Sequence, residues 1–320
     1  MTTLFMLPTH DTGTLSSAET EEWLDAWRTM APDRPAALLG RDDYEPEAVR
    51  YAIVWQPPRG ALAALPRLEA VFNCGAGVDA LIADPTLPDV PVVRLVADDL
   101  SQRMTEWVAL QVMTHHRRAL EYLEHQRGGE WRELPQPSAR DVRVGLMGYG
   151  TLARHAAPVL LALGYRVHGW SRSARSSGVT LHVGARGLDD FLAATDVLVC
   201  LLPHTPDTRG LLDADLIAKL SRDSAIGPVL INAGRGAVQV EADVAAALHS
   251  GALRGASLDV FATEPLPADS PLWGAPNLII TPHCASISDP RSTVAAILAQ
   301  IVRVERGEPL EHVVDRARGY

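Results

Sequence analysis

Three side chains in the second half of the chain are suited to reducing a carbonyl group that lies beside a carboxylate. Arg235, Glu264 and His283 each follow a short β-rich run. A guanidinium holds a carboxylate with two parallel hydrogen bonds, and an imidazolium can donate a proton to a carbonyl oxygen while a hydride reaches the carbon. A carboxylate on the other imidazole nitrogen favours the charged ring and fixes its orientation. Singly, they could be a turn arginine, a surface glutamate before Pro265 and a loop histidine, but their order and positions indicate a catalytic set.

A glycine-rich turn upstream of these residues predicts the source of the hydride. A β-rich run at 142–147 leads into Gly148-Tyr149-Gly150-Thr151-Leu152-Ala153, and a helical stretch and a second β-rich run at 166–170 follow. The two glycines allow a tight turn and a close approach to a pyrophosphate, and the next residues open a helix whose amides and dipole attract it. The motif alone could be a structural turn. Its strand–helix–strand setting favours a dinucleotide site at Gly148, Gly150, Thr151 and Leu152.

The residues after the second run predict which dinucleotide binds. NAD sites usually place an acidic residue there for the ribose 2′-hydroxyl, whereas this chain has Ser171-Arg172-Ser173-Ala174-Arg175 and no carboxylate. Serine hydroxyls can donate to a phosphate, and the guanidinium of Arg172 can bind it with two hydrogen bonds. Arg175 is better explained as an ordinary surface arginine. We therefore predict NADP(H), held by Ser171, Arg172 and Ser173.

Composition narrows the functional classes. With 320 residues the chain can form two domains, each with its own core. Its net charge of −10 disfavours a nucleic-acid partner, whose phosphates would be repelled. No apolar run approaches the ~20 residues of a membrane-spanning helix, and the N-terminal apolar run is too short for a signal peptide. Three widely spaced cysteines suggest reduced thiols. We expect a cytoplasmic protein with no membrane segment and no metal site.

Short β-rich runs alternate with helical stretches along the chain, which predicts an α/β fold of two doubly wound parallel sheets. The runs lie at 4–7, 37–39, 52–55, 70–73 and 92–96, and then at 142–147, 166–170, 197–202, 229–232, 256–260 and 278–281. Between the two series, apolar residues three and four apart predict one long helix from an N-cap at Ser101 to about Gln126, ended by Gly128-Gly129. Another helix is expected at about 291–306. The three catalytic candidates then fall at strand ends, where ligands bind in open α/β sheets.

Together these motifs resemble those of the D-isomer-specific 2-hydroxyacid dehydrogenases, and within them the bacterial glyoxylate/hydroxypyruvate reductase A type. The resemblance covers the whole chain and also includes Trp55-Gln56-Pro57-Pro58, Gly75-Ala76-Gly77-Val78-Asp79, Gln239-Val240-Glu241-Ala242-Asp243, Glu264-Pro265-Leu266-Pro267, Ser270-Pro271-Leu272-Trp273 and Val314-Asp315-Arg316-Ala317-Arg318-Gly319-Tyr320. It implies a Rossmann NADP-binding domain, 102–285, inserted in a flavodoxin-like substrate domain formed by 1–101 and 286–320. It also implies a homodimer formed through the cofactor domains and the linking helix.

The same resemblance implies roles for individual residues. Arg235 would hold the carboxylate of glyoxylate or hydroxypyruvate, His283 would be the acid/base and Glu264 its partner. Further substrate contacts would come from Trp55, Gly75, Ala76 and Gly77, and further cofactor contacts from Leu202, Pro203, Thr208, Ala233, Gly234, Asp259 and Ser286, with Asp259 at the nicotinamide carboxamide. The implied reaction is NADPH-dependent reduction of these 2-oxo acids to glycolate and D-glycerate, in a cleft that closes to exclude water.

Several alternatives stay open. Ala233-Gly234 is a more flexible pair than the Leu-Ala usual in the most similar subgroup, so another D-2-hydroxyacid specificity is an alternative. Some proteins of this fold are dinucleotide-sensing corepressors, a binding function that the intact acid–base pair disfavours. Trp131 follows the linking helix, where some relatives send a tryptophan into the partner's active site, although a core or surface position is favoured here.

Overall fold

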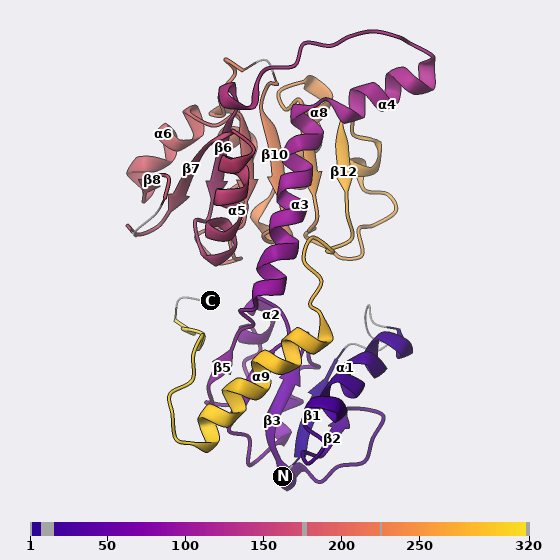
Figure 1. The fold of residues 1–320 in the computed structure, drawn as a ribbon, viewed down its shortest axis with the longest axis vertical. Coiled ribbons are helices and arrows are strands. Elements are labelled where there is room, and N and C mark those ends of the chain that lie inside the picture. Colours follow the sequence, from indigo (N-terminus) through magenta and orange to yellow (C-terminus); the bar gives the residue numbers. More distant parts are fainter. Residues whose placement is uncertain (1, 8–15, 175–177, 225, 318–320) are drawn as a thin grey trace. The chain divides into compact units, whose positions relative to one another are not determined.

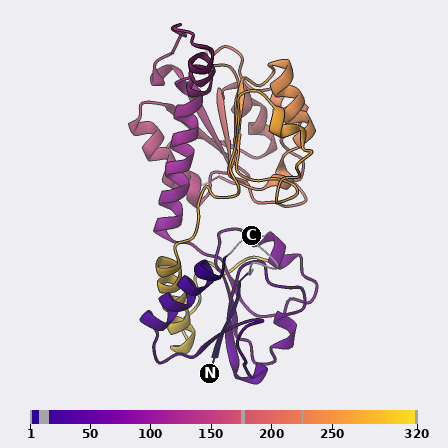
Figure 2. The same ribbon diagram turned by 90° about the vertical axis from the view of Figure 1, so that its right-hand side faces the viewer.

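The computed structural model describes residues 2–7, 16–174, 178–224 and 226–317, and the chain divides into two compact units. One unit comprises Met1–Leu100 and Ser288–Tyr320, and the other comprises Ser101–Ile287. Each is built on a parallel sheet against which helices pack (Figures 1 and 2). This confirms the expected α/β class with two parallel sheets. None of the described helices has the length and apolar character needed to cross a membrane.

The first unit contains a five-stranded sheet in the order β2-β1-β3-β4-β5, which is the flavodoxin-type order. Its strands are β1 (Thr2–Met6), β2 (Ala36–Leu38), β3 (Val49–Val54), β4 (Ala70–Asn73) and β5 (Val92–Val93). Its helices are α1 (Ser17–Met30), α2 (Asp79–Ile82) and α9 (Pro290–Glu305), with short 3-10 turns at η1 (Pro46–Ala48) and η2 (Leu62–Ala64). Helices α1 and α9 lie side by side (Figure 1), and an Arg34–Glu305 ion pair at 2.7 Å joins segments 271 residues apart.

The second unit contains a seven-stranded sheet in the order β12-β11-β10-β9-β6-β7-β8. The strands are β6 (Arg143–Met147), β7 (Arg166–Ser171), β8 (Thr180–Val183), β9 (Val197–Cys200), β10 (Val229–Asn232), β11 (Gly255–Leu258) and β12 (Leu278–Ile280). The helices after the linking segment are α5 (Thr151–Ala162), α6 (Leu188–Ala193), α7 (Ala214–Ala218) and α8 (Glu241–Ser250), with 3-10 turns η3 (Ala139–Asp141), η4 (Ala185–Gly187), η5 (Gly236–Val238) and η6 (Pro271–Gly274). The strand order reverses between β6 and β9, so the ligand-binding switch point of a dinucleotide fold lies at their carboxyl ends.

The linking segment differs from the single helix expected between Ser101 and Gln126. Helix α3 (Asp98–His116) begins three residues before the expected cap, so Ser101 lies within its first turn and its carbonyl accepts a hydrogen bond from Thr105 Oγ1 at 2.8 Å. Arg118 then adopts a left-handed conformation with φ of 55°, and a second helix, α4 (Ala119–Gly128), starts after it. No glycine or proline marks this break in the sequence, since residues 114–118 are Thr-His-His-Arg-Arg. Gly129, with φ of 66°, ends α4 as expected for a glycine after a helix.

The apolar face expected on the linking helix is only partly covered. Met104, Trp107, Val108 and Val112 of α3 are buried against α5 and the sheet. The side chains of two further apolar residues, Leu110 and Met113, are 60% and 41% exposed. Trp131, beyond α4, is also fully exposed, so the surface position rather than a core position holds for it. The outer side of α3 therefore carries apolar surface that the described chain leaves in contact with solvent.

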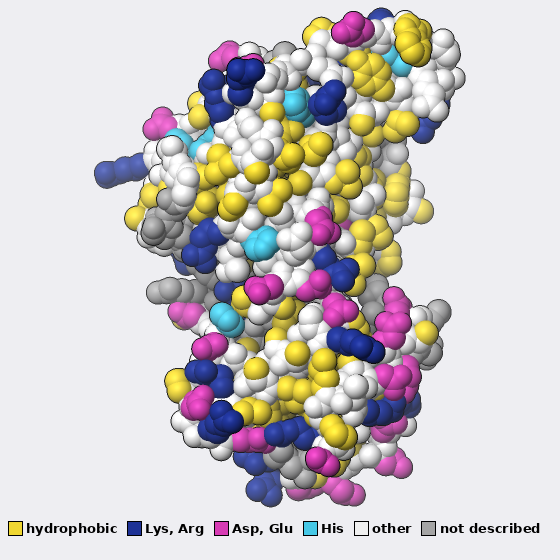
Figure 3. Space-filling view, viewed as in Figure 1, with side chains coloured by type: hydrophobic (Ala, Val, Ile, Leu, Met, Phe, Trp, Pro, Cys, Tyr) yellow, Lys and Arg dark blue, Asp and Glu magenta, His cyan; other side chains and the backbone are white. Residues whose placement is uncertain are grey.

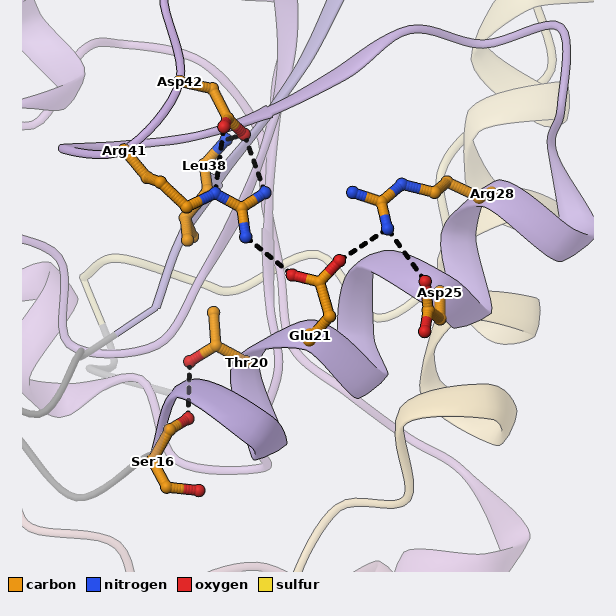
Figure 4. Close-up of polar contacts among 8 residues, drawn as sticks. All are labelled: Ser16, Thr20, Glu21, Asp25, Arg28, Leu38, Arg41 and Asp42. Atoms are coloured by element: carbon orange, nitrogen blue, oxygen red, sulfur yellow. Dashed lines mark hydrogen bonds and ion pairs between the residues drawn. The ribbon is translucent and has the colours of Figure 1, made fainter.

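Charged side chains tie α1 to the loop that follows β2 (Figure 4). Glu21 accepts hydrogen bonds from Arg28 and from Arg41, both at 2.6 Å, and these bonds lower the pKa of Glu21. Arg28 also pairs with Asp25 at 2.8 Å, and Arg41 pairs with Asp42 at 2.9 Å. Because these groups are largely exposed, each pair contributes little to stability on its own. Their role is to fix the position of this loop on the helix.

Two buried histidines in the second unit should make unfolding sensitive to mild acid. Burial lowers the pKa of His115 and of His168 to about 4, from an unfolded-state value of roughly 6.5. The unfolded chain therefore takes up these protons first. The free energy of unfolding is at its full value above pH ~6.5 and falls as the pH drops toward ~4, by about 1.4 kcal/mol per pH unit for each histidine.

Urea unfolding measured at several pH values checks this expectation. The midpoint for His168→Gln should fall less steeply over that range than the midpoint of the parent protein. His249→Gln, at an exposed position, serves as the matched control and should keep the parent slope. An unchanged slope in His168→Gln would show that this histidine does not govern the acid sensitivity.

Candidate active site

The glycine-rich turn joins β6 to α5 in the second unit. Gly148 has φ of 94°, and its amide and that of Tyr149 donate to the carbonyl of Trp170 at the end of β7, at 3.0 and 2.9 Å. A Cβ atom on Gly148 would lie 3.1 Å from the carbonyl group of Leu201. Glycine is thus needed here both for the left-handed conformation and for the close approach of the loop after β9.

The N-terminus of α5 offers open space for a phosphate. Gly150 is the N-cap residue and no side chain caps the helix. A Cβ atom on Gly150 would meet nothing closer than the carbonyl oxygen of Gly148 at 3.8 Å. Thr151 and Leu152 form the first turn, and Ala153 is fully buried against the sheet, which lets helix and strand pack closely. Uncapped amides at the positive end of a helix dipole form an anion site.

The residues expected to distinguish NADP(H) from NAD(H) lie at the end of β7. Arg172 and Ser173 are exposed, whereas Ser171 is buried and its hydroxyl donates to the carbonyl of Ser173 at 2.6 Å. Ser171 therefore shapes the turn, and the side chains accessible to a ligand at this point are those of Arg172 and Ser173. Arg175 lies outside the described residues.

The loop after β9 lies against the glycine turn. Leu202 is buried, and its Cδ2 atom would lie 3.1 Å from a Cβ atom on Gly148. Thr208 closes the loop, since its hydroxyl donates to the carbonyl of Pro203 at 2.7 Å and accepts from the amide of Thr205 at 2.8 Å. This loop brings Leu202, Pro203 and Thr208, which were expected to contact the cofactor, to the carboxyl end of the sheet.

The turn that carries Arg235 follows β10. Asn232, the last residue of the strand, accepts from the amide of Gly234 at 3.0 Å and donates to the carbonyl of Arg235 at 3.2 Å. A Cβ atom on Gly234 would lie only 2.5 Å from the carbonyl oxygen of Leu202. The glycine that looked merely flexible in the sequence therefore serves a close contact of two loops. The Arg235 guanidinium donates back to the carbonyl of Gly234 at 2.7 Å.

Glu264 and His283, the residues expected to act as an acid–base pair, are hydrogen-bonded to each other. His283 Nδ1 lies 2.8 Å from one carboxylate oxygen of Glu264, and the other oxygen accepts from the amide of Phe261 at 2.9 Å. Burial is the largest influence on the pKa of Glu264 and raises it, but these two hydrogen bonds and the charges of His283 and Arg235 outweigh it and lower the pKa. The carboxylate therefore stays charged, and it occupies the Nδ1 side of the His283 ring.

Asp259 anchors the loop that carries His283. Its carboxylate accepts from the Thr281 hydroxyl at 2.5 Å and from the amides of Cys284 and Ala285, both at 2.9 Å. Its carbonyl accepts from the amide of His283 at 2.8 Å. His283 has φ of 53°, a left-handed conformation that costs about 1–3 kcal/mol in a non-glycine residue and persists only when its surroundings enforce it. Ser286 follows in the same loop and is half-buried.

Burial raises the pKa of Asp259, and the three hydrogen bonds to its carboxylate act in the opposite direction. The residue was expected at the nicotinamide carboxamide, and a contact with that group stays a prediction. Sequence reasoning missed its loop-anchoring role, as it missed Asn232 and Gln239. Gln239 accepts from Asn232 at 2.9 Å and donates to the carbonyl of Val260 at 2.9 Å. An Asn at the end of a strand, directly before a glycine turn, was the available signal.

The remaining expected substrate residues lie in the first unit. Trp55 follows β3, and its ring covers Gly75 so closely that a Cβ atom there would lie 2.1 Å from a ring carbon. Gly75 is buried, while Ala76 and Gly77 are half-buried. No three His, Cys, Asp or Glu side chains in the described part of either unit are arranged to hold a metal ion.

The chain is similar to a set of characterised proteins. The model of the D-isomer specific 2-hydroxyacid dehydrogenase NAD-binding domain matches residues 109–285. A glyoxylate/hydroxypyruvate reductase A of Escherichia fergusonii is 39% identical over 100% of both chains, and one of Salmonella newport is 42% identical over 93% of this chain and 96% of its own.

Two solved structures extend this similarity to the fold. The NADPH-dependent glyoxylate/hydroxypyruvate reductase of Sinorhizobium meliloti, in complex with NADP and sulfate, has 45% identity, a TM-score of 0.92 and coverage of 100% of this chain and 99% of its own. A probable 2-hydroxyacid dehydrogenase of Rhizobium etli, in complex with NADP, HEPES and L(+)-tartaric acid, has 42% identity, a TM-score of 0.89 and the same coverage.

Proposed function

The chain belongs to the D-isomer-specific 2-hydroxyacid dehydrogenase family, and from this premise we propose that it uses NADPH to reduce small 2-oxo acids, glyoxylate to glycolate and hydroxypyruvate to D-glycerate. One observation carries the proposal. An acid–base pair, Glu264 and His283, and the guanidinium of Arg235 occupy strand ends in the same unit as an uncapped glycine turn of the dinucleotide-binding kind.

The residues of the second unit fit NADP(H). The uncapped N-terminus of α5, with open space at Gly150, suits a pyrophosphate, and the exposed Arg172 and Ser173 suit a ribose 2′-phosphate. The bound cofactor supplies a hydride to the carbonyl carbon of the substrate. His283 donates a proton from Nε2 to the carbonyl oxygen, while Glu264 holds Nδ1 and fixes the orientation of the ring. The guanidinium of Arg235 suits the substrate carboxylate, and the amides of Gly75, Ala76 and Gly77 in the first unit suit a carboxylate in the same way.

The direct test is NADPH oxidation with a panel of 2-oxo acids at fixed cofactor concentration. We expect turnover of glyoxylate and hydroxypyruvate. Turnover of another 2-oxo acid only would reassign the substrate within the same chemistry. If the protein bound NADPH tightly but none of the 2-oxo acids led to NADPH oxidation, the proposal would fail in favour of a dinucleotide-sensing function.

Arg172→Ala should raise the KM for NADPH by about 10–100-fold, because the variant loses hydrogen bonds to a doubly charged phosphate. Kinetics with NADH, which lacks that phosphate, should stay nearly unchanged. Arg209→Ala, an exposed arginine of the same unit, is the matched control and should affect neither cofactor. A wild-type enzyme with a higher kcat/KM for NADH than for NADPH would overturn the assignment.

We also propose that the protein is a homodimer joined through the apolar surface of α3 and α5. These helices share one buried cluster, and the Thr105 hydroxyl of α3 lies 2.7 Å from His155 Nδ1 of α5. Their outward apolar side chains are Leu110, Met113, Val159 and Leu161. Figure 3 shows hydrophobic side chains gathered over these helices. A second copy that covered them would remove this apolar surface from water.

Light scattering after size-exclusion chromatography tests the dimer. The wild-type chain should elute at twice the monomer mass, and the double variant Leu110→Glu/Leu161→Glu should elute as a monomer. Met30→Glu, which places the same charge on an exposed apolar position of the other unit, should leave the mass unchanged. A monomeric wild type would reject the dimer.

A further inference from the structure

The turn after β4 is held by a side chain that the proposed reaction has not yet used. Asn73 is the last residue of β4 and is only 3% exposed. Its side-chain amide Nδ2 donates to the carbonyl of Gly75 at 2.8 Å and to the carbonyl of Gly77 at 2.9 Å. One buried amide group thus binds two carbonyls of the same three-residue segment.

Two other contacts also hold carbonyls of this turn. The carbonyl of Gly75 also accepts from the amide of Leu95 at 3.1 Å, and the carbonyl of Cys74 accepts from the Ser288 hydroxyl at 2.7 Å. The amides of Gly75, Ala76 and Gly77 donate to no acceptor within residues 2–7, 16–174, 178–224 and 226–317. The carbonyls of Cys74, Gly75 and Gly77 therefore accept hydrogen bonds within the unit, whereas the N–H groups of Gly75, Ala76 and Gly77 can still donate to a ligand.

The second unit also contains an asparagine at the end of a strand that binds a carbonyl of the following turn. Asn73-Cys74-Gly75-Ala76-Gly77 after β4 and Asn232-Ala233-Gly234-Arg235-Gly236 after β10 share the pattern Asn-x-Gly-x-Gly. In both, the asparagine ends a parallel strand and its Nδ2 donates to a carbonyl in the following turn, at Gly75 and Gly77 in one case and at Arg235 in the other. Both turns are also the ones assigned to the substrate carboxylate. Asparagine suits this position because its short side chain ends in two N–H donors, which aspartate lacks.

We propose that Asn73 is a positioning residue for substrate binding, which holds the peptide groups of this turn so that its amides face the carboxylate of the 2-oxo acid. Its bond to the Gly75 carbonyl fixes the Ala76 N–H, which belongs to the same planar peptide group, and its bond to the Gly77 carbonyl fixes the end of the turn. The inference rests on the proposed function, because it assigns a carboxylate to those amides. Asn73 does not touch the reacting atoms. Its loss lets the carbonyl of Gly75 rotate together with the Ala76 N–H of the same peptide group, so that this amide no longer has a fixed direction.

Asn73→Asp and Asn73→Ala test the role, the first with the same shape and no donor. Because the amides bind ground state and transition state alike, both variants should raise the KM for glyoxylate by about tenfold or more while kcat changes by less than about threefold. The inhibition constant of oxalate, a dicarboxylate probe, should rise in parallel, and the KM for NADPH should stay unchanged. Hydrogen exchange at the amide of Leu95, which donates to the carbonyl of Gly75, should become faster in the absence of substrate.

Val71→Ala is the matched control, because it removes packing from the same buried strand and leaves every tether of the turn in place. It should keep the KM for glyoxylate and the oxalate inhibition constant. If the wild type reduces glyoxylate and the Asn73 variants keep both constants, the positioning role is wrong and the proposed function stands. If the wild type reduces no 2-oxo acid, the proposed function fails and the carboxylate role of Asn73 fails with it, whatever the exchange rates show.

Discussion

His283→Ala should lower kcat for 2-oxo acid reduction by about 10²–10⁴-fold, the usual cost of losing a positioned proton donor. The geometry gives the physical reason. Glu264 occupies Nδ1 of the ring and keeps its own negative charge, so Nε2 is the nitrogen that can protonate a substrate oxygen. The Asp259 carboxylate and carbonyl hold the loop in which His283 adopts its left-handed conformation. Replacing His283 by alanine keeps the loop but removes the imidazole that donates the proton.

Steady-state kinetics and cofactor binding check this expectation together. The affinity for NADPH should be unchanged in His283→Ala, and the loss should appear in kcat and in kcat/KM alike. His249→Ala, at an exposed position of the same unit, is the control for loss of a histidine and should keep full activity. Retention of wild-type kcat by His283→Ala would remove this residue from the chemistry and point to water or another side chain as the proton donor.

Arg235→Ala should lower kcat/KM for glyoxylate by roughly 10²-fold or more, mainly through a higher KM, because a guanidinium holds a carboxylate with two charge-assisted hydrogen bonds. Arg235→Lys should recover only part of the loss, since an ammonium group keeps the charge but not the planar fork of donors. The Asn232 tether and the tight packing of Gly234 on Leu202 position the guanidinium. Arg235→Ala should leave the affinity for NADPH unchanged.

Arg254→Ala provides the control for Arg235→Ala. Arg254 is a half-buried arginine of the same unit that pairs with Glu121 at 2.8 Å, so its loss costs an ion pair without touching the strand-end turns. Its KM for glyoxylate should match that of the wild type. A variant Arg235→Ala that altered only the affinity for NADPH would place this arginine at the cofactor and leave the substrate carboxylate to other groups.

Much of the site could be predicted from the sequence because its parts are local. The glycine turn at Gly148 and Gly150, the segment 171–174 without a carboxylate and the short buried strands can each be recognised from a few neighbouring residues. The structure places the glycine turn and the segment 171–174 at strand ends, as expected. The parallel α/β class follows from the same alternation of short runs and helical stretches. Periodicity could not show the left-handed break at Arg118, nor that Leu110 and Met113 would lie uncovered.

The sequence by itself determined which residues could do the chemistry: Arg235, Glu264 and His283 after buried strands, and a glycine turn before a helix. Only the tertiary structure decided how they are held. The Asp259 carboxylate binds amides 25 and 26 residues away, and Gly234 contacts the backbone of Leu202 in the loop after the neighbouring strand. Such contacts depend on the order of strands in the sheet. Strand order comes from packing over the whole domain, whereas the conformation of a turn or a strand is set largely by the residues within it.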